Sequence, residues 1–64
     1  MENKHVTINV ELESEEAEAF AQFLKRVSFD DFKKNAYNEN EAYLMQDVGE
    51  KIRKALAYCG FNPR

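Results

Sequence analysis

The chain has 64 residues, with 12 acidic against 9 basic side chains, a formal net charge of −3 and a pI of about 5.0. A chain this short forms a single domain, residues 1–64, and buries only about 60% of the surface that its unfolded state exposes. Small domains of this kind usually add a disulfide, a metal or a partner chain. Cys59 is the only cysteine, which excludes an internal disulfide, and its distance in sequence from His5 disfavours a metal site.

The acidic balance disfavours a general nucleic-acid-binding surface. No apolar run approaches the roughly 20 residues of a membrane-spanning helix, and the first five residues are polar rather than typical of a secretion signal. A single unpaired thiol fits a reducing compartment. We therefore expect a cytoplasmic protein with no membrane segment and no cofactor, stabilised by association with a second copy.

Residues 5–12 alternate between polar and apolar side chains. The apolar positions share one face and the polar positions the other: Val6, Ile8, Val10 and Leu12 against Thr7, Asn9 and Glu11. This period of two predicts a half-buried β-strand. Because a lone strand cannot satisfy its own backbone N–H and C=O groups, we expect it to pair antiparallel with the same strand of a second copy. A sheet edge on another protein is the alternative partner.

A helix is predicted over Glu15–Val27, with Ser14 as its N-cap and acidic residues in its first turn. Its apolar positions recur at helical spacing and predict one core-facing stripe: Ala17, Phe20, Ala21, Phe23, Leu24 and Val27. A capping-box pattern, Ser28-Phe29-Asp30-Asp31, then opens a short second helix. Phe29 and Phe32 on this helix are expected to dock onto the core.

The last helix is predicted from about Glu41 to Cys59, with Asn38 and Asn40 as candidate caps, of which Asn38 has capping-box spacing with Glu41. Its core stripe is expected to contain Met45, Val48, Ile52, Ala55, Leu56 and Cys59. Gly49 indicates either close approach of another backbone or a tolerated surface glycine. Gly60 suits the left-handed position after the helix, from which Phe61 can fold back onto Leu56. The predicted fold class is therefore α+β, one N-terminal strand followed by three helices with a short middle one.

Residues that could carry catalysis are few. His5 is interpreted as a solvated strand residue, and Cys59, at helical spacing with Leu56, as a buried and inert thiol. The only glycines, Gly49 and Gly60, form no phosphate-binding loop. We therefore predict that the protein is not an enzyme.

Binding to another protein is the remaining class. Most of the carboxylates are explained by the favourable electrostatics of acidic residues at helix starts. The alternative interpretation is an acidic patch that faces a basic partner. Exposed tyrosines are common interface anchors. The candidate partner-binding residues are Glu15, Glu16, Glu18, Asp30, Asp31, Tyr43 and Tyr58.

The strand Val6–Leu12 followed by Ser14-Glu15-Glu16 resembles the start of ribbon-helix-helix repressors and antitoxins. That resemblance implies a strand dimer whose polar residues, Thr7, Asn9 and Glu11, enter the DNA major groove. Two features depart from the family: these positions carry no Arg or Lys, and residues 28–40 are longer than its tight turn between helices.

Three stretches, residues 21–27, 40–45 and 55–64, resemble a family of small uncharacterised bacterial proteins associated with phages, plasmids and integrative elements. The resemblance implies a context rather than an activity, since small products of mobile elements often act by binding. The leading hypothesis is therefore an acidic, homodimeric protein-interaction module that serves as an inhibitor or accessory factor. The alternative is a ribbon-helix-helix-like DNA-binding regulator or antitoxin.

Overall fold

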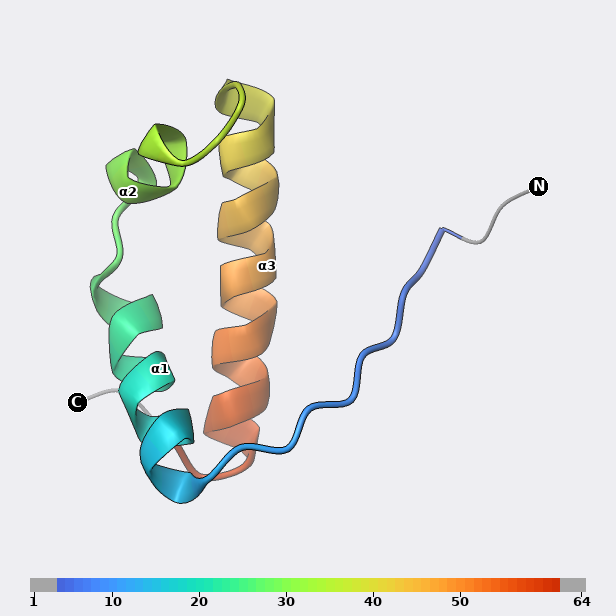
Figure 1. Ribbon diagram of the computed structural model, residues 1–64, viewed down its shortest axis with the longest axis vertical. Coiled ribbons are helices and arrows are strands. Elements are labelled where there is room, and N and C mark those ends of the chain that lie inside the picture. Colours follow the sequence, from blue (N-terminus) through green and yellow to red (C-terminus); the bar gives the residue numbers. More distant parts are fainter. Residues whose placement is uncertain (1–3, 62–64) are drawn as a thin grey trace.

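The computed structural model describes residues 4–61 and contains three helices: α1 (Ser14–Arg26), α2 (Phe29–Lys34) and α3 (Glu39–Tyr58). α1 runs antiparallel to α3 and lies beside its C-terminal half (Figure 1). The short α2 lies against the N-terminal half of α3. Viewed down the shortest axis, the helices lie beside one another in one layer, and the molecule measures 34 × 32 × 15 Å (Figure 1). We call these three helices and their connections the helical body.

The predicted N-terminal β-strand is wrong. Residues 4–12 are extended, yet no strand is present anywhere in residues 4–61, so the all-helical architecture replaces the predicted α+β fold class. Alternation of apolar and polar residues describes an extended conformation, whereas a strand also needs a neighbouring strand for its hydrogen bonds. We call residues 4–12 the arm, because they extend away from the helical body (Figure 1).

The helix starts are fixed by short-range hydrogen bonds. Ser28 and Asp31 form the predicted capping box, in which the Ser28 N–H donates to the Asp31 carboxylate at 2.9 Å. The cap of α1 lies one residue earlier than predicted, at Glu13 rather than Ser14. There the Glu13 N–H donates to the Glu16 carboxylate at 2.9 Å, a reciprocal bond that moves the first helical turn back by one residue.

Both ends of α3 follow local rules. Of the two candidate caps, Asn38 caps the start, because its side-chain oxygen accepts the Glu41 N–H at 2.9 Å. The helix therefore begins at Glu39, two residues earlier than predicted. At the other end Gly60 has a φ of 100°, which places it in the left-handed region. The Phe61 N–H then donates to the Leu56 carbonyl at 2.8 Å, and Phe61 packs against the core cluster that contains Leu56. The predicted helix-ending motif is therefore confirmed.

The buried core is small and built mainly from small side chains. Among the described residues the buried apolar ones are Ala17, Ala21, Ala42 and Leu56. Phe20 and Phe23, which were predicted to lie in the core, are 41% and 51% exposed. The alanines let α1 and α3 approach closely, and the larger side chains of the same stripe are left at the margin of the contact.

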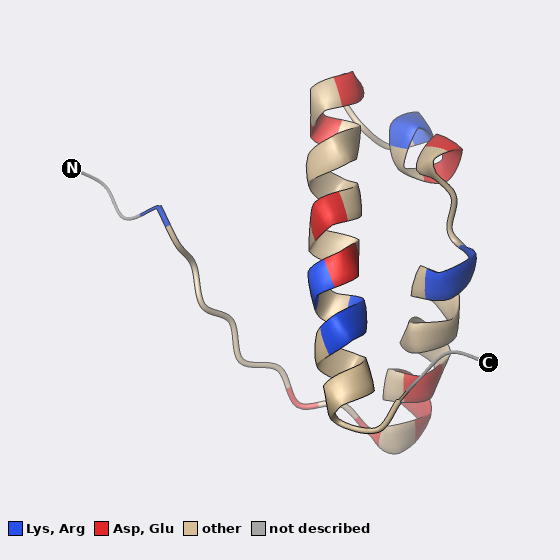
Figure 2. Cartoon of the chain, turned by 180° about the vertical axis from the view of Figure 1, so that it is seen from behind, with Lys and Arg blue, Asp and Glu red and all other residues tan. Residues whose placement is uncertain are grey.

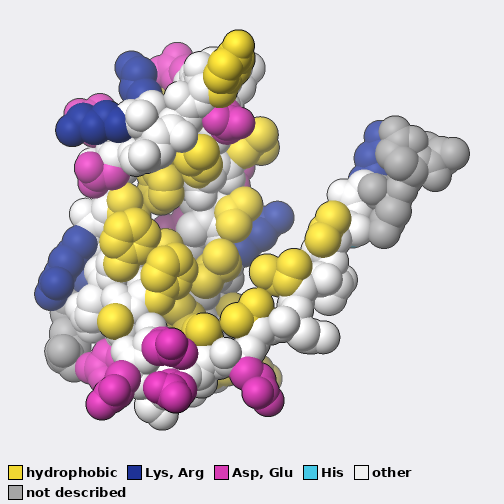
Figure 3. All heavy atoms as spheres, in the orientation of Figure 1, with side chains coloured by type: hydrophobic (Ala, Val, Ile, Leu, Met, Phe, Trp, Pro, Cys, Tyr) yellow, Lys and Arg dark blue, Asp and Glu magenta, His cyan; other side chains and the backbone are white. Residues whose placement is uncertain are grey.

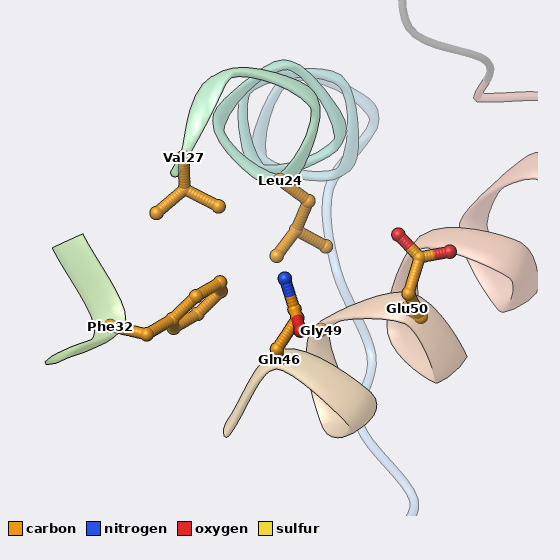
Figure 4. Close-up of a pocket in the computed structure, with 6 residues that line it drawn as sticks. All are labelled: Leu24, Val27, Phe32, Gln46, Gly49 and Glu50. Carbon is orange, nitrogen blue, oxygen red and sulfur yellow. The ribbon is translucent and has the colours of Figure 1, made fainter. Parts of the chain in front are cut away.

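Gly49 faces side chains rather than another backbone. A Cβ at this position would meet Phe32 at 3.5 Å and Leu24 at 3.6 Å, both ordinary van der Waals distances. Figure 4 shows these residues with Gln46 around a small cavity of about 50 Å³ where the three helices meet. Phe32 is half-buried here, which confirms that α2 docks through its phenylalanines.

Candidate interaction surface

The arm presents a row of apolar side chains that the rest of the chain barely covers. Val6 is 86% exposed, Ile8 70%, Val10 68% and Leu12 48%, so exposure increases with distance from the helical body. At the base of the arm, Glu13 has an extended backbone conformation and caps α1. These four residues are the ones predicted to form a dimer strand. The structure leaves them available to a partner without forming the strand itself.

An open groove separates the arm from the helical body, with a volume of about 940 Å³. One wall consists of the four apolar arm residues, and the opposite wall consists of side chains from α1 and α3, including Phe20, Val48, Ile52 and Ala55. In the part of the chain that the structure describes, the charged residues that line it are Glu16 and Lys51, one of each sign. Figure 3 shows hydrophobic side chains gathered on this side of the molecule, with charged ones along its edges.

Aromatic side chains extend the apolar surface beyond the groove. The rings of Phe20 and Phe23 stack with centroids 5.4 Å apart, and both rings are half-exposed. On the whole, the chain exposes 5696 Å², whereas a compact protein of 7.5 kDa exposes about 4,250 Å². Contiguous apolar surface of this kind marks an interaction site in soluble proteins.

The predicted acidic residues of α1 lie together at one edge of the molecule. Glu15, Glu16 and Glu18 are exposed in the first turns of α1, beside the entrance of the groove, and Figure 2 shows acidic residues gathered at this helix start. Glu16 also accepts the Glu13 N–H, so it serves the helix cap as well as the surface. We call Glu13, Glu15, Glu16 and Glu18 the acidic edge.

The second predicted acidic pair lies far from this edge. Asp30 and Asp31 belong to α2, at the opposite end of the molecule from the start of α1 (Figure 1). Hydrogen bonds from the Ser28 backbone and hydroxyl lower the pKa of Asp31. Asp31 is therefore accounted for by the cap, and the two acidic groups do not form one patch.

The two candidate tyrosines are also separated. Tyr43 packs its ring against Phe29, with centroids 4.6 Å apart, and remains 52% exposed. Tyr58 is 95% exposed at the last residue of α3, about 22 Å away along the helix axis. A single partner contact does not include both unless it covers most of α3.

The remaining predicted residues are the DNA-facing ones on the arm and the Cys59 thiol. Thr7, Asn9 and Glu11 are exposed along the arm, where they bring no positive charge. Cys59 was predicted to be buried, and this is wrong: its side chain is exposed and lines the groove. The helical stripe of α3 correctly placed Cys59 on the same side as Leu56, but within residues 4–61 no side chain buries the end of that stripe.

The groove wall on the helical body is the part of the surface that the sequence did not reveal. Val48, Ile52 and Ala55 were assigned to the core because they recur at helical spacing. That spacing shows that residues share a face, but the number of helices available to cover the face decides whether they are buried. The signal that was available is the number of large apolar residues, which is greater than a single layer of three helices can bury.

The described residues include neither a group of side chains that could hold a metal ion nor a helix that could cross a membrane. Within residues 4–61, no three His, Cys, Asp or Glu side chains come together as a group that could hold a metal ion. In the same part of the chain, each helix is too short or too polar to cross a bilayer.

Comparison with known proteins places the chain in a family. No curated protein and no solved structure matches it significantly. The model of a family of unknown function, DUF7706, matches residues 1–64. Since this match covers the entire sequence, the chain belongs to the DUF7706 family.

Proposed function

We propose that the protein is a non-enzymatic protein-interaction module that works as a homodimer and binds another protein, as an inhibitor or accessory factor. The observation that carries the proposal is the inverted distribution of apolar residues. Eleven large apolar residues are exposed among those described, whereas the buried core contains three alanines and one leucine. A partner that covers the exposed set supplies the burial that the helical body lacks.

The acidic edge supports a basic partner surface. Its carboxylates gather at the start of α1 (Figure 2), so a partner with a basic surface meets a negative rim there, beside the groove. Charged rims of this kind govern association rate and partner choice more than affinity. An origin in phages, plasmids or integrative elements is part of the same proposal, and it rests on the sequence resemblance alone.

The ribbon-helix-helix alternative has less support. It needs a strand pair whose polar side chains reach base edges, and the described arm offers Thr7, Asn9 and Glu11 without a strand. Affinity for DNA comes largely from Lys and Arg at phosphates, which these positions do not supply.

Charge reversal on the acidic edge tests the proposal. Immobilised wild-type protein is expected to recover one protein with a basic surface from a bacterial lysate, and a Glu15→Lys variant is expected to recover much less of it. Glu15 suits this test because, unlike Glu16, it takes no part in the cap of α1. Glu39→Lys is the matched control, since it makes the same charge change in the first turn of α3.

Three outcomes contradict the proposal or part of it. Recovery of no partner contradicts binding to another protein, and equal recovery by both variants contradicts the role of the acidic edge. A salt-sensitive mobility shift of duplex DNA by the wild-type protein would favour the ribbon-helix-helix alternative instead.

A further inference from the structure

The groove between the arm and the helical body is lined by apolar side chains on both sides. The arm forms one wall, with Val6 and Ile8 near its tip, and α1 and α3 form the other. Because the arm is itself a wall, it cannot also fill the groove while it keeps this direction. No other segment of residues 4–61 is left to fill it, since the rest of them form the helices and their connections.

We infer that the occupant is the arm of a second copy, so that two chains exchange their arms and each arm lies in the partner's groove. This rests on the proposed function, since it names the surface through which the module associates with itself. The contact is made by side chains, Val6, Ile8 and Val10 of one copy against Phe20, Val48 and Ile52 of the other. It requires no strand.

The exposed area fits this inference. The chain exposes 5696 Å², which is about 1,450 Å² more than a compact protein of its mass. A stable interface of standard size removes about 800 Å² from each partner. The excess counts the polar and apolar surface of the whole chain together, and it is larger than one partner's share of a standard interface.

The length of the arm is sufficient for this contact. An extended arm of nine residues, 4–12, is about 30 Å long. The groove follows α3 from Val48 to its C-cap Cys59, about 16 Å along the helix axis. The arm of one copy is therefore long enough to reach from one end of this wall to the other.

Charge does not oppose the contact. Each chain has a formal net charge of −3, so two copies repel each other if their acidic residues meet. The groove avoids this, because among residues 4–61 the charged side chains that line it are Glu16 and Lys51, one of each sign.

Symmetry makes the contact finite. Arm and groove belong to the same chain, so one two-fold rotation forms two equivalent arm–groove contacts at once. The pair is then closed, and it also supplies the second layer that a one-layer body lacks.

Complementary variants test the exchange. Ile8→Asp places a charge on the apolar side of the arm and is expected to weaken the dimer on the order of 100-fold, as for a central interface residue. Thr7→Asp adds the same charge to the polar side of the same segment and is expected to leave the dimer intact. Sedimentation velocity over a concentration series measures both, and circular dichroism checks that the helices are retained.

The groove side receives its own variants. Val48→Asp is expected to give a monomer, and Ala55→Asp, at an exposed position of the same wall, serves as a second variant if Val48→Asp loses helicity. A mixture of Ile8→Asp and Val48→Asp chains contains one intact arm and one intact groove. It is therefore expected to form heterodimers, visible by native mass spectrometry, at concentrations where each variant alone is monomeric.

Cys59 supplies an independent readout, because its exposed thiol lines the groove. Its reaction with a soluble thiol reagent is expected to slow as the wild-type concentration rises, and to be independent of concentration in Ile8→Asp. Protection at every concentration would show that the chain's own arm fills the groove, which overturns the inference.

The remaining outcomes separate this inference from the proposed function. A wild-type dimer that survives Ile8→Asp, or a mixture that forms no heterodimer, overturns arm exchange and leaves a homodimeric module with another interface. A wild-type chain that is monomeric at every concentration overturns both arm exchange and the homodimer. Recovery of a basic partner is measured in a separate experiment, and its result tests only the binding of another protein.

Discussion

The helical body and the arm use apolar residues in opposite ways. In the body, Ala17, Ala21 and Leu56 are buried and hold α1 against α3, whereas in the arm Val6 and Ile8 are larger on average and are 86% and 70% exposed. The alanines allow close approach of helices at little cost in side-chain entropy. The difference shows that the helices are organised by contacts inside the chain, and that the arm is left to contacts with another molecule.

The difference between the helical body and the arm is tested most strongly by making the same substitution, leucine to alanine, in each region. Leu56→Ala removes the one large side chain of the buried core and is expected to cost about 2–5 kcal/mol. Since a core of this size supplies only about 3–5 kcal/mol, the variant is expected to lose most of its helical signal in circular dichroism at room temperature.

Leu12→Ala is the matched control, because Leu12 lies at the base of the arm and is 48% exposed. In dilute solution, where the chain is monomeric under the inference above, we expect its melting temperature to stay close to that of the wild type. Equal losses in the two variants would contradict the division between body and arm.

The close approach of α1 and α3 is tested by enlarging an alanine. Ala21 is 1% exposed between the helices, and Ala21→Leu is expected to cost about 1–3 kcal/mol because the added carbons force the helices apart. Chemical denaturation measures the free energy of unfolding. Ala19→Leu, at an exposed position of the same helix, is the control and is expected to change stability by less than about 0.5 kcal/mol.

The two glycines are expected to respond with opposite signs. Gly49→Ala should raise the free energy of unfolding by about 1 kcal/mol, because the new Cβ meets Phe32 and Leu24 at ordinary distances and alanine favours the helix. Gly60→Ala should lower it by about 1 kcal/mol, because the φ of 100° strains any residue with a Cβ. A loss of stability in Gly49→Ala would show that the helices leave no room at that position.

The parts of the fold that follow from the sequence are those decided within a few residues. The pairs Ser28–Asp31 and Asn38–Glu41 are three residues apart, and the Gly60–Phe61 ending depends on one turn of α3. Residue type and spacing were sufficient to predict these contacts. At α1 they were not, because the cap is Glu13 and the prediction was Ser14.

The parts that the sequence did not reveal depend on what lies opposite. The alternation of residues 5–12 correctly predicted extended backbone with one apolar side, but a strand requires a neighbour that residues 4–61 do not contain. Similarly, the apolar stripes of α1 and α3 showed which residues share a face. They did not show that a single layer of helices leaves Phe20 and Val48 exposed. Of the candidate site, the apolar arm residues were recognised in advance and the groove wall was not.

The smallest expected effect is the pH dependence of the cap at α2. Hydrogen bonds from Ser28 lower the pKa of Asp31 in the folded chain, so this carboxylate stabilises the fold above its unfolded pKa of about 4. The stabilisation is lost as the pH falls through the lower, folded pKa. Melting temperatures measured from neutral pH downward should therefore fall more steeply for the wild type than for Asp31→Asn, whose side chain does not titrate. Asp30→Asn removes the adjacent charge without touching the cap and should keep the steeper fall, because only the carboxylate bonded to Ser28 couples protonation to the helix start.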